Sequence, residues 1–189
     1  MYVLHSNGGP VGSQTYKKYG RAADCICRRL CLLWILIVPL HILSTAIMKV
    51  SLHRVNQAVH FEAKNTSGNV VHIDGSPDAG GEGLGVRPME LLLMGLASCS
   101  AIDVVLILKR MRQEIQDLHI EVEGERVEEI PAVFRKIHVH YLLSGDLDSG
   151  KVDRAIRLSM EKYCSATRML EQMAEITHSF EIRSEALSG

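Results

Sequence analysis

The sequence predicts an α+β domain, in which short strands and helices follow one another without a regular repeat. One long apolar segment, residues 89–111, begins just after a proline and indicates a helix. Two later segments, 117–127 and 133–143, alternate apolar and charged residues, as strands with one wet face do. The 189 residues suffice for one such domain. A net charge of -1 and an aromatic content of 5% give no basis for nucleic-acid binding.

The chain after residue 48 opens with two predicted strands, residues 49–63 and 69–75, because apolar positions recur through both. Asn65-Thr66-Ser67-Gly68-Asn69 lies between them and predicts the turn of a hairpin. The glycine-rich segment 76–85 lacks the Lys-Ser/Thr ending of a phosphate-binding loop. We therefore interpret it as a connection and not as a nucleotide site.

The long helix is predicted to begin at Pro88, because proline is tolerated best in the first turn. Glu90 falls in that turn, where the helix dipole favours an anion. Residues 89–111 are apolar almost all the way round until Lys109, and such a helix must be buried on most sides. It is either the central helix of the domain or covered by a second subunit.

The C-terminal half predicts two strands, two helical pieces and a last strand. Residues 128–131 form the turn between the alternating segments, and 146–149 read as a helix cap. The helical stripe that follows consists of Val152, Ile156, Met160 and Tyr163. A second helical piece at 165–173 and a strand at 176–182 complete the order β-β-α-β-β-α-α-β.

Residues 1–47 differ from the rest and are expected to form an N-terminal extension to a domain at 48–189. Arg28-Arg29 precede an apolar run at 30–43, a pattern typical of a signal peptide or short anchor. The run is shorter than the roughly 20 apolar residues that cross a bilayer. We favour a misassigned start, with the functional protein beginning at Met48. Three cysteines of the extension are interpreted as incidental to the chemistry: Cys25, Cys27 and Cys31.

Two isolated cysteines are the candidate reactive groups. Cys99 lies within the long helix, and Cys164 lies at the end of the later helical stripe. A single cysteine in an apolar helix is most often a small buried hydrophobe. Two of them suit a dithiol–disulfide cycle if the fold brings them together. His138 and His140 share one strand face but have no evident third ligand for a metal.

Three motifs together resemble the OsmC/Ohr family over residues 48–184. They are Arg87-Pro88-x-Glu90-Leu-Leu-Leu, Ala97-x-Cys99, and the second cysteine, Cys164, at the end of a late helix. The resemblance implies an OsmC-like fold, with antiparallel sheets around a long buried central helix, and an intertwined homodimer. Its best-known members are thiol-dependent peroxidases that reduce organic hydroperoxides. It therefore implies that Cys99 is peroxidatic, that Cys164 resolves, and that an external dithiol of lipoyl type or a small thiol is the reductant. It implies no flavin, haem or metal cofactor.

A peroxidatic thiol must ionise, so Cys99 needs a nearby cation. Arg87 and Arg168 are the candidates, whereas Asp103, one turn after Cys99, opposes ionisation unless it is itself paired. Glu90 precedes Cys99 by nine residues, which is roughly 13 Å along the helix and about half a turn out of phase. We therefore expect Arg87 and Glu90 to act as site residues from the other subunit, in composite sites of a homodimer.

A second class of function stays open: a non-enzymatic OsmC-like module, stress-related or binding a hydrophobic ligand, with unreactive cysteines. Typical peroxidase members place the glutamate directly after the proline, where this chain has Met89. A cycling disulfide suits a reducing compartment, which predicts a cytoplasmic protein. An exported or membrane-anchored protein is expected instead if residues 30–47 are a real signal or anchor.

Overall fold

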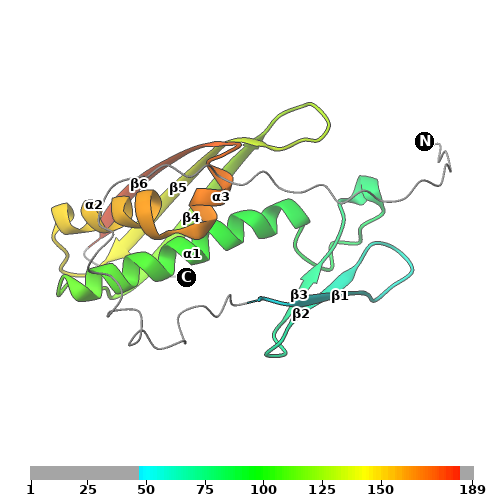
Figure 1. Cartoon of the computed structure of the whole chain (residues 1–189), viewed down its shortest axis with the longest axis horizontal. Helices are drawn as coiled ribbons and strands as arrows, with labels where there is room; N and C mark the ends of the chain where they lie inside the picture. Colours follow the sequence, from blue (N-terminus) through cyan, green and yellow to red (C-terminus); the bar gives the residue numbers. More distant parts are fainter. Residues whose placement is uncertain (1–46, 184–189) are drawn as a thin grey trace, which may run out of the picture. The chain divides into compact units, whose positions relative to one another are not determined.

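The computed structural model describes residues 47–183, so the predictions for residues 1–46 lie outside the described part (Figure 1). The chain divides between Ile47 and Met48 into two units, of which the second is Met48–Gly189. This unit confirms the α+β class. Its elements are β1 (Val50–Arg54), β2 (Phe61–Asn65), β3 (Val70–Ile73), the short turn η1 (Pro77–Ala79), α1 (Pro88–Arg110), β4 (Asp117–Arg126), β5 (Phe134–Ser144), α2 (Ser149–Leu158), the wide turn η2 (Ser159–Tyr163), α3 (Ser165–Leu170) and β6 (Glu175–Arg183).

The first sheet has the order β1-β2-β3, with both pairs antiparallel. The single strand predicted at 49–63 is wrong, because the chain reverses between β1 and β2. Asn56 explains the reversal: its Oδ1 accepts hydrogen bonds from the backbone N–H groups of Ala58 and His60, at 3.0 and 3.1 Å. A side chain that satisfies the backbone in this way competes with the strand ladder. The predicted hairpin between β2 and β3 is confirmed.

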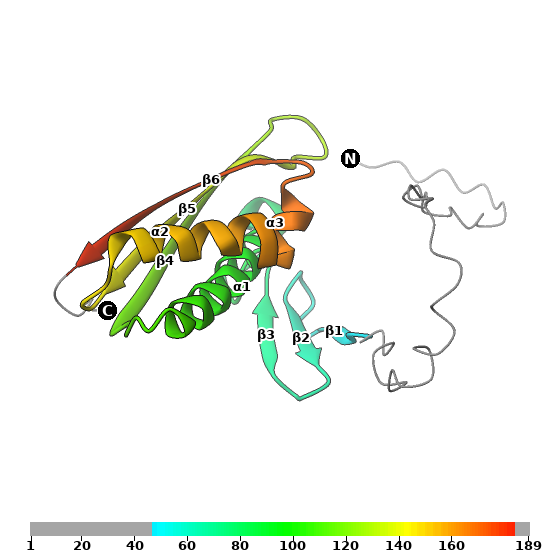
Figure 2. The same cartoon turned by 60° about the vertical axis from the view of Figure 1, so that its left-hand side comes forward.

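The second sheet has the order β4-β5-β6, and one of its faces packs against the helices to form the hydrophobic core. The β4–β5 pair is antiparallel, whereas β6 runs parallel to β5. A parallel neighbour requires a crossover connection, and the chain from α2 through α3 provides it. The sheets are therefore not purely antiparallel. Figure 2 shows α1 and α2 over the same face of this sheet. The alternate residues of β5 that point to that face are all buried: Ile137, Val139, Tyr141 and Leu143.

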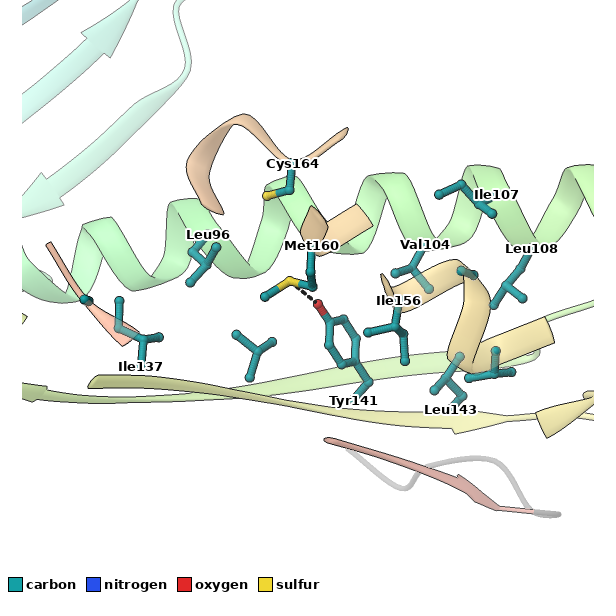
Figure 3. Packing of buried hydrophobic residues seen from close by; sticks show 14 of the residues in the cluster. Leu96, Val104, Ile107, Leu108, Ile137, Tyr141, Leu143, Ile156, Met160 and Cys164 are labelled. Atoms are coloured by element: carbon teal, nitrogen blue, oxygen red, sulfur yellow. Dashed lines mark hydrogen bonds between the residues drawn. The ribbon is translucent and has the colours of Figure 1, made fainter. Parts of the chain in front are cut away.

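Helix α1 begins at Pro88 as predicted, but it is buried along one face only. The buried stripe follows helical spacing and consists of Leu96, Ser100, Val104, Ile107 and Leu108. The opposite side remains apolar and exposed, with Leu92, Met94, Ile102, Val105 and Leu106 between 41% and 61% accessible. The expectation of burial on most sides is thus not met within one chain. Length and composition alone would let α1 cross a membrane, but core helices share these properties, and α1 packs against the second sheet (Figure 3).

The segment from α2 to α3 places Cys164 at a break between helices. Asp148 caps α2, because its Oδ1 accepts the backbone N–H of Lys151 at 2.8 Å. After α2 the helix continues as the π-helical turn η2, in which hydrogen bonds span five residues. The N–H of Cys164 accordingly donates to the carbonyl of Ser159 at 2.8 Å. Cys164 itself occupies the N-cap position of α3. The predicted second helical piece is confirmed, although it ends at Leu170 and not at Met173.

Candidate redox site at Cys99 and Cys164

The structure brings Cys99 of α1 together with Cys164 of the α2–α3 junction. Their Sγ atoms and a carboxylate oxygen of Asp103 all lie within 4.8 Å of one another. Both cysteines are free thiols. A disulfide would require the sulfurs to approach to about 2.05 Å. The two residues are 65 positions apart in sequence, so only the tertiary fold creates this pair.

The two thiols differ in their surroundings. Cys164 is 0% exposed, whereas Cys99 is partly exposed. Burial raises the pKa of the Cys164 thiol; hydrogen bonds from Thr167 lower it in part, and the neighbouring Cys99 raises it further. One of those bonds runs from the Thr167 backbone N–H to Sγ of Cys164 at 3.5 Å. A molecule arriving from solvent therefore meets Cys99 first.

A chain of buried hydroxyl groups leads from the thiol pair into the core. Ser159 Oγ lies 3.2 Å from Asp103 Oδ2 and 3.3 Å from Ser100 Oγ. Ser100 in turn hydrogen-bonds the hydroxyl of Tyr141, which donates to Met160 Sδ at 3.3 Å (Figure 3). Burial raises the pKa of Tyr141 to about 12. Sequence reasoning missed this network; its only local signal was Ser100, a polar residue on the apolar stripe of the helix.

Arg168, one of the two candidate cations for the Cys99 thiolate, is engaged by other groups. Its Nη1 lies 2.8 Å from Glu171 Oε1, and its Nη2 donates to the backbone carbonyl of Glu161. Arg168 would share a helix face with Cys164 only if one helix ran through both residues, but the chain breaks at Cys164, which is the N-cap of α3.

Arg87 and Glu90 lie at the first turn of α1, away from the cysteines of their own chain. The backbone N–H of Arg87 donates to Glu90 Oε2 at 2.9 Å, so the carboxylate satisfies a free donor at the helix start. Both side chains are exposed and line a cavity of about 370 Å³, whose walls include neither cysteine. Within one chain, the cysteines and the Arg87–Glu90 pair therefore form two separate sites.

The histidine pair of β5 contacts hydroxyl groups. His138 Nδ1 lies 2.8 Å from Thr177 Oγ1 and its Nε2 lies 2.8 Å from Ser179 Oγ. His140 Nδ1 lies 2.7 Å from the same Ser179 oxygen. These contacts account for three of the four ring nitrogens without a metal.

The fold and the paired cysteines define a class: α+β proteins with two cysteines brought together between a central helix and a later helix junction. Residues 80–179 match the family described as OsmC-like protein. The chain belongs to the OsmC-like family. It is 41% identical over 127 residues to Protein YhfA of Escherichia coli (strain K12), covering 67% of this chain and 92% of YhfA.

Solved structures agree with this assignment. A hypothetical protein from Aquifex aeolicus VF5 is 34% identical with a TM-score of 0.65, covering 74% of this chain and 98% of that one. The organic hydroperoxide resistance protein OsmC from Legionella pneumophila has a TM-score of 0.58 at 15% identity, covering 73% and 98% of the two chains. OhrB of Bacillus subtilis, named for organic hydroperoxide resistance, has a TM-score of 0.51 at 21% identity, covering 71% and 98%. At these last two identities the likeness shows the fold alone.

Proposed function

We propose that this protein is a thiol-dependent peroxidase that reduces organic hydroperoxides through a cycle of Cys99 and Cys164. The observation that carries the proposal is the approach of the two sulfurs to within 4.8 Å. The family includes proteins named for organic hydroperoxide resistance, which supports the choice of substrate class. The apolar core that packs against Cys99 suits an organic peroxide better than hydrogen peroxide.

The reaction follows from thiol chemistry. The thiolate of Cys99 attacks the terminal oxygen of the hydroperoxide, so that an S–O bond forms and the O–O bond breaks. The alkoxide takes up a proton and leaves as the alcohol, and Cys99 becomes a sulfenic acid. The sulfur of Cys164 then attacks Cys99, an S–S bond forms, and water leaves. An external dithiol reopens the disulfide by exchange and is itself oxidised.

The surroundings of the two thiols support this division of roles. Cys99 is partly exposed, as a sulfur that meets the peroxide must be. Cys164 is fully buried and its pKa is raised, so it is a poor nucleophile towards a molecule in solvent. It is nevertheless close enough to trap a sulfenic acid on Cys99. A cycle that needs a reductant also supports a cytoplasmic setting.

We infer further that the working unit is a homodimer with composite sites. The exposed face of α1 is apolar over several turns, and a second copy of this chain would bury it. Strand β1 adds Val50 and Leu52, which are 75% and 61% exposed. Since Arg87 and Glu90 cannot reach Cys99 of their own chain, a partner chain would bring them to it. There the guanidinium would stabilise the Cys99 thiolate against the negative charge of Asp103.

The first experiment measures peroxide consumption by the full chain in which Cys25, Cys27 and Cys31 are changed to serine. Cumene hydroperoxide is the substrate and dihydrolipoamide the reductant. Cys99→Ser should abolish turnover. Cys164→Ser should stop the cycle after one oxidation, leaving a Cys99 sulfenic acid that dimedone traps and mass spectrometry detects. No turnover by folded, reduced parent protein with several peroxides and dithiols would contradict the proposal.

The composite site has its own test. Arg87→Met should lower kcat/KM by about 10²-fold, as the loss of a charge-stabilising group in an active site commonly does. Arg154→Met, which removes an exposed arginine of α2, should leave it unchanged. Ile102→Glu should convert the dimer to a monomer in analytical ultracentrifugation and reduce turnover with it. A fully active monomer would refute the composite site.

The binding module remains the second candidate, because an apolar groove of about 260 Å³ lies between α1 and β4. Its walls are Glu90, Leu93, Met94, Ala97, Ile120 and Val122. The rate of Cys99 alkylation by iodoacetamide as a function of pH separates the two functions. A thiol that ionises near neutral pH supports the peroxidase, and one that ionises only in strongly alkaline solution supports the binding module.

A further inference from the structure

Asp103 makes the thiol site a three-group cluster. Its carboxylate lies one helical turn after Cys99 and within 4.8 Å of both sulfurs. Among residues 47–183, these three side chains form the only group of His, Cys, Asp or Glu close enough together to hold a metal ion. The peroxidase cycle proposed above gives the carboxylate no task, and its negative charge opposes the thiolate that the cycle needs.

Within residues 47–183 no Lys, Arg or His side chain forms an ion pair with Asp103. Every ion pair of this part of the chain joins other residues, and Arg168 is occupied by Glu171. Asp103 has one hydrogen-bond partner, Ser159, on Oδ2. Two potential thiolates and a carboxylate thus converge where a positive charge would stabilise all three.

We propose that the reduced protein binds a thiophilic divalent cation such as Zn²⁺ through Cys99 Sγ, Cys164 Sγ and Asp103 Oδ1. Water fills the fourth position, on the partly exposed side of Cys99. Zinc is held by such sets of three protein ligands and one water in open tetrahedral sites. The inference rests on the reduced cysteine pair and does not depend on peroxide reduction.

The distances suit this cation. Two sulfurs bound tetrahedrally at about 2.3 Å from zinc lie about 3.8 Å apart. The two sulfur atoms, now within 4.8 Å of each other, therefore need to close by at most about 1 Å. Hydrogen bonds from neighbouring residues orient two of the three ligands, as is usual around protein-bound metals. Ser159 donates to one carboxylate oxygen of Asp103 and leaves the other free, and the Thr167 N–H donates to the Cys164 sulfur.

Binding exchanges protons for metal. Each thiol loses one proton and forms an S–Zn bond, so the chain takes up one Zn²⁺ and releases two protons. Affinity should therefore rise with pH. A sulfur that is bound to zinc is a weaker nucleophile, and a disulfide cannot ligate. Metal binding and oxidation of the pair should thus exclude each other.

The test titrates Co²⁺, a spectroscopic substitute for zinc, into the full chain. Cys25, Cys27 and Cys31 are changed to serine because their thiols would otherwise compete for the metal. We expect one equivalent of Co²⁺ to bind, with a near-ultraviolet thiolate-to-cobalt charge-transfer band that Zn²⁺ displaces. Cys99→Ser and Cys164→Ser should each abolish the band. Asp103→Asn should weaken affinity by at least about tenfold, the loss seen even for an outer-shell partner.

The matched control is Asp146→Asn, an exposed carboxylate with no side-chain hydrogen bond among the described residues. It should bind Co²⁺ as the parent does. Circular dichroism and thermal unfolding of each variant establish that it is folded. A band that survives in either cysteine variant, or an affinity unchanged in folded Asp103→Asn, overturns the site. If the parent protein shows the cobalt charge-transfer band but does not reduce peroxides, only the proposed peroxidase function is refuted.

Discussion

Removing the hydroxyl of Tyr141 should change how the stability of the protein depends on pH. This side chain is fully buried, and its hydroxyl contacts Ser100 and Met160. At neutral pH, Tyr141→Phe should lower the free energy of unfolding by about 1–2 kcal/mol. That is the usual cost of a lost buried hydrogen bond, and Ser100 keeps Ser159 as a partner.

The pH dependence follows from the raised pKa of Tyr141. Tyrosine is neutral when protonated, and burial raises its pKa from 10.0 to about 12 in the folded chain. The folded state therefore holds this proton more tightly than the unfolded state. Its contribution to stability is complete below pH 10 and is lost as pH rises through about 12, a total of about 3 kcal/mol. About half of this loss should be reached near pH 11.

Urea unfolding of wild type and Tyr141→Phe, at about pH 9 and about pH 11, measures the effect. The stability advantage of the wild type should shrink by about 1 kcal/mol between these two conditions, because phenylalanine cannot ionise. Tyr163→Phe is the matched control, since Tyr163 is 50% exposed. It should follow the wild type at both pH values. Parallel curves for wild type and Tyr141→Phe would refute the argument that the buried neutral phenol resists ionisation.

Three substitutions test the packing and capping around the site by urea unfolding. Leu96→Ala should destabilise by about 2–5 kcal/mol because this fully buried side chain leaves a cavity, whereas Leu84→Ala, which is 52% exposed, should change little; equal effects would contradict the assigned core. Gly124→Ala should cost about 1–3 kcal/mol, since an added Cβ would lie 2.5 Å from Phe134 Cε1, and an unchanged midpoint would mean that the ring moves freely. Asp148→Ala should cost about 1 kcal/mol through loss of the α2 cap, and Asp148→Asn should restore most of it.

Local signals in the sequence predicted the elements well where the signal and its effect share one segment. Pro88 marks the start of α1, and Asn65 to Asn69 mark the β2–β3 turn. The break at Asn56 was missed because the apolar spacing runs through it, whereas the side-chain bonds that turn the chain do not register in hydrophobic periodicity.

The site could be predicted only in part, because its contacts are non-local. The two cysteines stood out as isolated residues, and the resemblance to a family paired them. The hydroxyl network joins Ser100 of α1, Tyr141 of β5 and Ser159 of η2, and no spacing within any one of these elements indicates it. The burial of α1 was overestimated for a related reason: apolar residues show that a face is covered, but not which chain covers it.

The electrostatics of the thiol site lead to one physical question, which is the source of its positive charge. Within residues 47–183 of one chain, the carboxylate of Asp103 lies within 4.8 Å of both sulfurs, and Arg168 is paired with Glu171. A pair of thiolates beside a carboxylate is unstable in a partly buried site unless a positive charge joins it. The two proposals provide that charge differently: Arg87 from a second chain, or a bound divalent cation. They predict opposite responses to Arg87→Met in the dimer, because losing the guanidinium should slow peroxide reduction but strengthen Co²⁺ binding. A dimer in which Arg87→Met weakened both would show that the arginine organises the site and does not compete with the metal for its charge.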